Sequence, residues 1–94
     1  MAKAIWNSQV IAESNATVMV DGNHYFPRDS IRKEFFIDSA LHSVCPFKGM
    51  ARYYTLVDDE NENEDAAWYY SKPKPWFEKI TNYVAFWKGV EITV

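Results

Sequence analysis

The residues best suited to chemistry gather in one short stretch, Cys45-Pro46-Phe47-Lys48-Gly49. It holds the only cysteine of the chain, and its proline and glycine favour a turn that brings Cys45 near Lys48. A thiol becomes a nucleophile when a nearby cation or base lowers its pKa, and a lysine ammonium is such a cation. Cys45 and Lys48 are therefore the candidate catalytic pair, with Lys48 stabilising an anion.

The same turn has alternative interpretations that involve no catalysis. A free cysteine often behaves as a small buried hydrophobe, and His42 could act as its base only if the chain between them doubles back. Lys48 and the backbone N–H groups of the turn could instead hold an anionic group of a ligand. A lysine here could also be solvated, or paired with Glu34 or Asp38.

Aromatic residues make up 17% of the chain, which is more than a small core needs. In extended segments Trp68 and Tyr70 share one face, and Tyr53 lies on the opposite face from Tyr54. A barrel has one interior, so some of these rings must line a groove, the outer surface or a subunit contact. Alternatively, the tyrosines cap the core with their hydroxyls in water. The predicted ligand-binding residues are Lys48, Tyr53, Trp68, Tyr70 and Glu34.

The first half of the chain has three predicted features. Residues 5–13 are expected to form one strand, and Asp21-Gly22-Asn23 predicts a hairpin because glycine accepts a positive φ in tight turns. Asp29 or Ser30 can cap a short helical turn that runs through Lys33. A strand is expected over residues 34–37, and residues 39–44 are expected to be irregular.

The second half reads as strands joined by polar turns. An antiparallel pair is predicted from residues 51–57 and 66–70, with the acidic segment 58–65 as its loop. Pro75 can start a helical turn over residues 76–80. A final hairpin is predicted around Lys88-Gly89. Short strands at this spacing indicate a single all-β domain over residues 1–94, a small antiparallel barrel or sandwich with one or two helical turns.

Composition narrows the classes of partner. The net charge of −3 provides no basic field for a phosphate backbone, so nucleic acid is not expected as a partner. No apolar run approaches membrane-spanning length and the first residues lack a signal peptide's apolar region, which predicts a cytoplasmic protein without membrane contact. One cysteine and two histidines on separate segments predict no metal site, and no cofactor is expected.

Four blocks in order resemble the bacterial family called domain of unknown function 427 (DUF427). They are Tyr25-Phe26-Pro27, the Cys45–Gly49 turn with Ala51 and Tyr53 behind it, residues 66–70 (AAWYY), and residues 83–86 (YVAF). The resemblance covers nearly the whole chain and implies a compact, mainly β domain. The family sometimes carries a nucleotidyltransferase-like label, but this chain has no glycine-rich phosphate loop and no Asp-x-Asp pair beside a Gly-Ser turn.

Together these observations predict a binding module for a small molecule or a protein, with a pocket near the Cys45–Gly49 turn. The alternative is an enzyme that uses Cys45 as a nucleophile or redox thiol. A third possibility is a homodimer assembled through the surplus aromatic rings.

Overall fold

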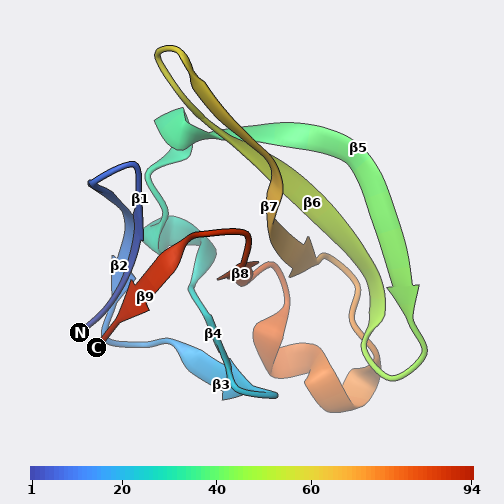
Figure 1. Cartoon of the computed structure of the whole chain (residues 1–94). Coiled ribbons are helices and arrows are strands. Elements are labelled where there is room, and N and C mark those ends of the chain that lie inside the picture. The colour runs from blue at the N-terminus through green and yellow to red at the C-terminus, as the bar shows by residue number, and fades with distance from the viewer.

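The computed structural model describes residues 1–94 and is organised around two long central strands. These are β6 (Gly49–Asp58) and β7 (Asn61–Tyr70), which pair antiparallel. Strand β5 (Phe36–Cys45) adds to the free side of β6, and β8 (Val84–Phe86) adds to β7. The result is a four-stranded sheet in the order β5-β6-β7-β8 (Figure 1).

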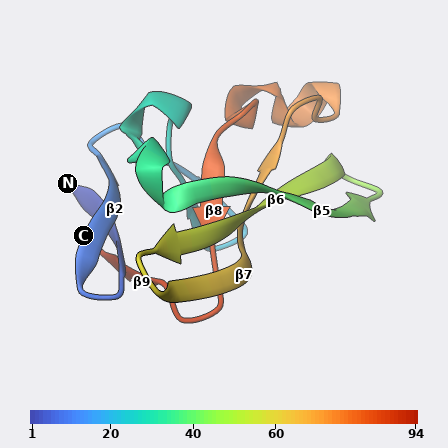
Figure 2. The same cartoon turned by 90° about the horizontal axis from the view of Figure 1, so that it is seen from above.

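Two smaller sheets complete the β structure. Strands β1 (Ala2–Trp6), β2 (Gln9–Ser14) and β9 (Glu91–Thr93) form one in the order β2-β1-β9, so the two ends of the chain lie side by side. The predicted Asp21-Gly22 hairpin is confirmed as β3 (Val18–Val20) and β4 (Asn23–Tyr25). The β1–β2 hairpin and the β5–β6 turn lie at opposite ends of the molecule (Figure 2).

All the helical segments are short 3₁₀ turns. Three occur, η1 (Arg28–Ser30), η2 (Lys33–Phe35) and η3 (Pro75–Ile80), and the last has its proline at the start as predicted. The predicted cap at Asp29 or Ser30 is wrong, because no side chain caps η1 or η2. None of the helical segments has the length and hydrophobicity of a membrane-spanning helix.

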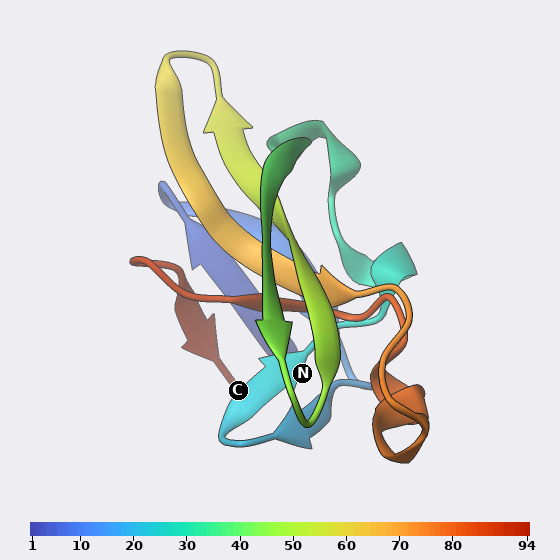
Figure 3. The same cartoon turned by 90° about the vertical axis from the view of Figure 1, so that its right-hand side faces the viewer.

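The four-stranded sheet packs on both of its faces, which makes the fold sandwich-like rather than a closed barrel (Figure 3). One face meets the β2-β1-β9 sheet around a core that includes Phe26 and Tyr54. The other face meets the β3–β4 hairpin and η3 around a second core that includes Tyr70 and Ile80. Alternate side chains of one strand therefore serve two cores, as Ala67 and Trp68 of β7 do.

The first predicted strand, residues 5–13, is wrong, because the segment is a hairpin. Asn7 and Ser8 have φ values of 51° and 62° and form the two-residue turn between β1 and β2. Both central residues of such a turn need positive φ, and asparagine tolerates it better than most residues. The sequence there lacks the glycine that usually marks this turn.

The segments predicted to be irregular are largely strand. Residues 39–44 belong to β5, with a register shift against β6 between Asp38 and His42. Most of the predicted acidic loop 58–65 is the start of β7, and only Asp59 and Glu60 form the turn. Solvent-facing charged side chains are compatible with a strand when the backbone ladder is complete.

The predicted pairing of the last two strands is also wrong. The turn at Lys88-Gly89 is present, with φ values of 51° and 86°, but β8 pairs with β7 while β9 pairs with β1. Two hydrogen bonds from Trp87 hold the chain against β7 just before this turn. The Trp87 amide donates to the Ala66 carbonyl at 3.0 Å, and the Trp87 indole donates to the Asp65 carbonyl at 2.6 Å. The chain then leaves for the other sheet.

Candidate functional site

The turn between β5 and β6 is the predicted Cys45–Gly49 turn, and a neighbouring segment fixes its position. Cys45 and Gly49 face each other as a strand pair. Gly49 has φ +117°, and a Cβ there would lie 3.2 Å from the Lys72 carbonyl oxygen, so a side chain would be strained and crowded. The Lys74 amide donates to the Lys48 carbonyl at 2.8 Å. The turn is therefore packed against the chain that leads into η3.

The side chain of Lys48 connects this turn to the β3–β4 hairpin. Its ammonium forms an ion pair with Asp21, the first residue of that hairpin's turn. The Lys48 side chain is only 14% exposed, whereas that of Asp21 is 68% exposed. The hydrogen bond to Asp21 is the main cause that raises the pKa of Lys48, so the lysine is charged at neutral pH. It pairs with neither Glu34 nor Asp38, the two acids considered from the sequence.

Aromatic rings extend from Lys48 across the second face of the central sheet. Tyr53 of β6 lies directly opposite Trp68 of β7, and Trp68 lies opposite Ala85 of β8. Trp68 meets Tyr25 edge to face at 6.2 Å between ring centres, and its indole donates to the Tyr25 hydroxyl at 3.3 Å. Trp87 meets the other side of Trp68, also edge to face at 6.2 Å. Small Ala85 leaves the large rings room above this face.

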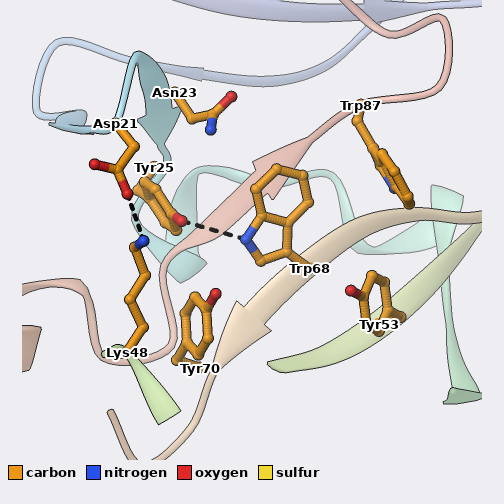
Figure 4. Close-up of a pocket in the computed structure, with 8 residues that line it drawn as sticks. All are labelled: Asp21, Asn23, Tyr25, Lys48, Tyr53, Trp68, Tyr70 and Trp87. Carbon is orange, nitrogen blue, oxygen red and sulfur yellow. Dashed lines mark hydrogen bonds and ion pairs between the residues drawn. The ribbon is translucent and has the colours of Figure 1, made fainter. Parts of the chain in front are cut away.

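These side chains line a cavity of about 260 Å³ that is open to solvent (Figure 4). Five rings form most of its wall: Tyr25, Tyr53, Trp68, Tyr70 and Trp87. Asp21, Asn23 and Lys48 line the rest, and the view places Lys48 and Asp21 at the side of Tyr25 and Tyr70, with Tyr53 and Trp87 at the far side of Trp68. We call this cavity the aromatic pocket.

Four of the five residues predicted to bind a ligand lie together in the aromatic pocket: Lys48, Tyr53, Trp68 and Tyr70. Glu34 does not. It lies in η2 beside Phe35, which is buried in the first core, and its carboxylate pairs with Arg32 at 3.3 Å on the surface. The placement of Glu34 beside Lys48 was wrong because η2 packs on the other face of the sheet.

The sequence did not indicate four residues of the pocket: Asp21, Asn23, Tyr25 and Trp87. Three of them belong to the β3–β4 hairpin, which was itself predicted from its Asp-Gly turn. The hairpin itself is predictable from neighbouring residues, but its position over β6 and β7 depends on contacts between distant segments. The fourth residue, Trp87, directly follows β8, a strand whose pairing was predicted wrongly.

Tyr25 and Tyr70 bring two hydroxyl groups to the lysine side of the pocket. Burial raises the pKa of both phenols above the usual value, so both stay neutral and can donate a hydrogen bond at neutral pH. The Tyr53 hydroxyl, in contrast, shares a hydrogen bond of 3.0 Å with Ser43. The polar groups of the pocket are therefore concentrated at its lysine side.

Cys45 is half-buried and is not among the residues that line the aromatic pocket. Hydrogen bonding from the Lys48 backbone is the main cause that lowers the pKa of its thiol, and the Phe47 backbone and the Lys48 charge add to this effect. His42 cannot serve as the base in the way considered above, because residues 42–45 are extended in β5 and do not double back. Side chains three positions apart in a strand point to opposite faces.

We expect Cys45 to react with iodoacetamide at lower pH than the same cysteine does in the unfolded chain. A lowered pKa means that the thiolate, which is the reactive form, appears earlier as pH rises. The measurement is the alkylation rate from pH 6 to 10, in buffer and in urea. The Lys48→Met variant keeps the backbone donors of the turn. The pH midpoint of Cys45 alkylation in the folded variant should therefore remain below the midpoint measured in urea. Equal midpoints for folded and unfolded wild-type protein would contradict this assignment.

Exposed apolar side chains lie near the turn but outside the pocket. Val44 and Met50 are a cross-strand pair and are 71% and 43% exposed. Phe47 is 72% exposed, and its carbonyl accepts a hydrogen bond of 2.7 Å from the indole of Trp76. The homodimer considered from the sequence, which would assemble through the surplus aromatic rings, stays a prediction.

Comparison with known proteins identifies the family without assigning an activity. The model of the family described as a domain of unknown function, DUF427, matches residues 1–94, which is the whole chain. No curated protein matches the chain significantly. The predicted family is thus confirmed: the chain belongs to the DUF427 family.

Proposed function

We propose that this protein is a binding module for a small molecule and that the aromatic pocket is its binding site. The observation that carries this proposal is the gathering of five aromatic rings and an ion pair around one open cavity of about 260 Å³. Small-molecule sites are typically concave and mostly apolar, with a few polar groups that fix the orientation of the ligand. The aromatic pocket has this composition.

The pocket is also preorganised. Trp87 is held by its indole bond to the Asp65 carbonyl, and the Lys88 ammonium lies 5.0 Å from the centre of its ring. Trp68 is held by Tyr25, and Lys48 by Asp21. A ligand that enters such a site does not have to order these side chains, so less of the contact energy is lost to conformational entropy.

Catalysis by Cys45 ranks below binding as a function. The thiol lies outside the pocket, and no histidine is placed to act as its base. The lowered pKa of Cys45 comes mainly from the backbone of its own turn. A reactive thiol would therefore have to act on a molecule that approaches from outside the aromatic pocket.

A fragment screen followed by two matched variants tests the proposal. We expect ligands that raise the melting temperature of the wild-type protein to bind Tyr53→Ala about two- to tenfold more weakly, because one aromatic contact contributes about 0.5–1.5 kcal/mol. Tyr69→Ala is the control, because Tyr69 neighbours Trp68 on β7 but packs on the opposite face, stacked on Tyr54. Calorimetric titration below the melting temperature of both variants gives the affinities.

Two outcomes would overturn the proposal. One is a screen in which no compound stabilises the wild-type protein. The other is a set of ligands whose affinities fall in Tyr69→Ala and not in Tyr53→Ala, which would place their site on the first face of the sheet.

A further inference from the structure

The hydrogen-bonding groups at the lysine side of the aromatic pocket are mostly donors. An ammonium carries three N–H donors, and Lys48 forms a side-chain hydrogen bond only to Asp21. The Tyr25 hydroxyl already accepts a bond from the Trp68 indole, which leaves its own hydrogen available. The Asp21 carboxylate, an acceptor at this side, is already paired with Lys48, so a ligand group that meets Lys48 and Tyr25 must accept hydrogen bonds.

Tyr70 adds a further donor. Its hydroxyl has no hydrogen-bond partner within the protein, yet no buried polar side-chain atom of the molecule is left unpaired. The hydroxyl must consequently be open to the pocket, whose wall it helps to form (Figure 4). It can donate to a ligand oxygen at the same side of the cavity as Lys48.

The charges at this side also favour an anion. Lys48 is largely withdrawn from water, while its partner Asp21 is mostly exposed and can be solvated if a ligand takes its place. A cationic ligand group would instead compete with Lys48 for Asp21 and leave the less exposed charge without a partner, which is costly. A carboxylate satisfies both Lys48 and the neighbouring hydroxyls with charge-assisted hydrogen bonds.

The far side of the pocket offers rings and little hydrogen-bonding capacity. Both indole N–H groups are already used, Trp68 toward Tyr25 and Trp87 toward the Asp65 carbonyl, and the Tyr53 hydroxyl is bonded to Ser43. Flat apolar groups pack well edge to face or offset against such rings. The cavity of about 260 Å³ lies below the roughly 300–1,000 Å³ of drug-sized sites, which limits the ligand to one or two rings.

We propose that the ligand is a small aromatic carboxylate, with its carboxylate at Lys48, Tyr25 and Tyr70 and its ring against Trp68, Trp87 and Tyr53. This inference rests on the proposed function, since it names the class of molecule that the aromatic pocket takes. It follows from the division of the cavity into a side of hydrogen-bond donors and a side of aromatic rings.

Three probes that share one ring and differ in charge test the ligand class: benzoate, benzyl alcohol and benzylammonium. Each is titrated at pH 7.5 and low salt while the indole N–H signals of the four tryptophans are followed by NMR. Trp68 and Trp87 report on the pocket, and Trp6 and Trp76 outside it are internal controls. We expect benzoate to shift the two pocket signals and to bind at least fivefold more tightly than the other two probes.

Variants then locate the carboxylate. Lys48→Met and Tyr70→Phe should each weaken benzoate binding at least threefold, whereas Lys79→Met, which removes an exposed lysine of η3 outside the pocket, should not. The ranking of the probes on wild-type protein remains decisive if a variant fails to fold.

The possible failures are distinguishable. Tighter or equal binding of benzyl alcohol or benzylammonium at Trp68 and Trp87 overturns the aromatic acid and leaves the pocket proposal intact. Pocket signals that no probe moves also overturn the aromatic acid, and the fragment screen with Tyr53→Ala then decides separately whether the pocket binds anything.

Discussion

Phe26→Ala is expected to lower the free energy of unfolding by about 3–5 kcal/mol, the usual cost of deleting a buried phenylalanine. Phe26 is fully buried, and its ring meets Phe86 edge to face at 5.6 Å between ring centres. It follows Tyr25 directly, so two adjacent residues fill the two cores on either side of the central sheet. The loss is a large part of the roughly 5–15 kcal/mol available to a domain.

The backbone at Phe26 should survive this substitution. Its amide and carbonyl exchange two hydrogen bonds of 2.8 Å with Val84, and alanine can form both. The measured loss therefore reports on the side chain and its cavity. Urea unfolding at 25 °C gives the free energy, and the melting temperature should fall by at least about 12 °C in a domain of this size.

Phe47→Ala is the matched control, because it removes the same side chain from a position that is 72% exposed. Its effect should stay within about 0.5 kcal/mol, as is usual for surface positions. If Phe26→Ala cost no more than Phe47→Ala, the Phe26 side chain would not be buried in the first core.

Local chemistry explains which parts of this fold were predictable. The Asp21-Gly22 hairpin, the Cys45–Gly49 turn and the start of η3 at Pro75 each depend on a residue with restricted or unusual backbone preferences. Such preferences act over three or four residues, so the sequence displays them directly. The Asn7-Ser8 turn was missed because neither of its residues is glycine.

The arrangement of strands was less predictable because it depends on distant partners. β8 and β9 are joined by a turn suited to a hairpin, yet each gains a partner in a different sheet. The β6–β7 pair also contains a bulge that the sequence did not indicate. The register shifts between Tyr54 and Leu56, and Asp65 on the opposite strand has φ 57°. The chain around Asp65 then provides the carbonyl that anchors Trp87.

Only the part of the candidate site that depends on local sequence was predictable; the part that depends on distant contacts was not. Alternation along β7 places Trp68 and Tyr70 on one face, which the sequence shows. A second core on the opposite face was not expected, because the sequence argument assumed the single interior of a barrel. The ion pair of Lys48 with Asp21 joins two hairpin turns 27 residues apart, and no local pattern indicates it.

High pH should destabilise this protein more than a similar domain with exposed tyrosines. Burial raises the pKa of Tyr25, Tyr54 and Tyr70 above their value of about 10 in an unfolded chain. Below pH 10 these phenols are neutral in both states and the stability is fully present. Above pH 10 the unfolded chain loses its protons first, so the free energy of unfolding falls as pH rises toward the folded-state pKa values.

The expected slope is about 1.4 kcal/mol per pH unit for each tyrosine that ionises only on unfolding. The Lys48–Asp21 pair adds to the loss in the same direction, because the raised pKa of Lys48 means that unfolding releases its proton above pH 10.5. Urea unfolding at steps from pH 8 to 11.5 measures the slope. The tyrosines and Lys48 should contribute nothing from pH 8 to 9, where the lowered pKa of Cys45 makes the free energy of unfolding rise slightly with pH, in the opposite direction.

Tyr70→Phe separates the tyrosine contribution from general alkaline damage. Phenylalanine fills the same space and has no proton to lose, so the decline above pH 10 should be shallower than in wild type by about 1.4 kcal/mol per pH unit. The comparison uses slopes, so any constant cost of the lost hydroxyl cancels. Parallel curves for the two proteins would mean that Tyr70 ionises as readily in the folded protein as in the unfolded chain. In that case the Tyr70 phenol would be more hydrated than its position between η3 and the central sheet implies.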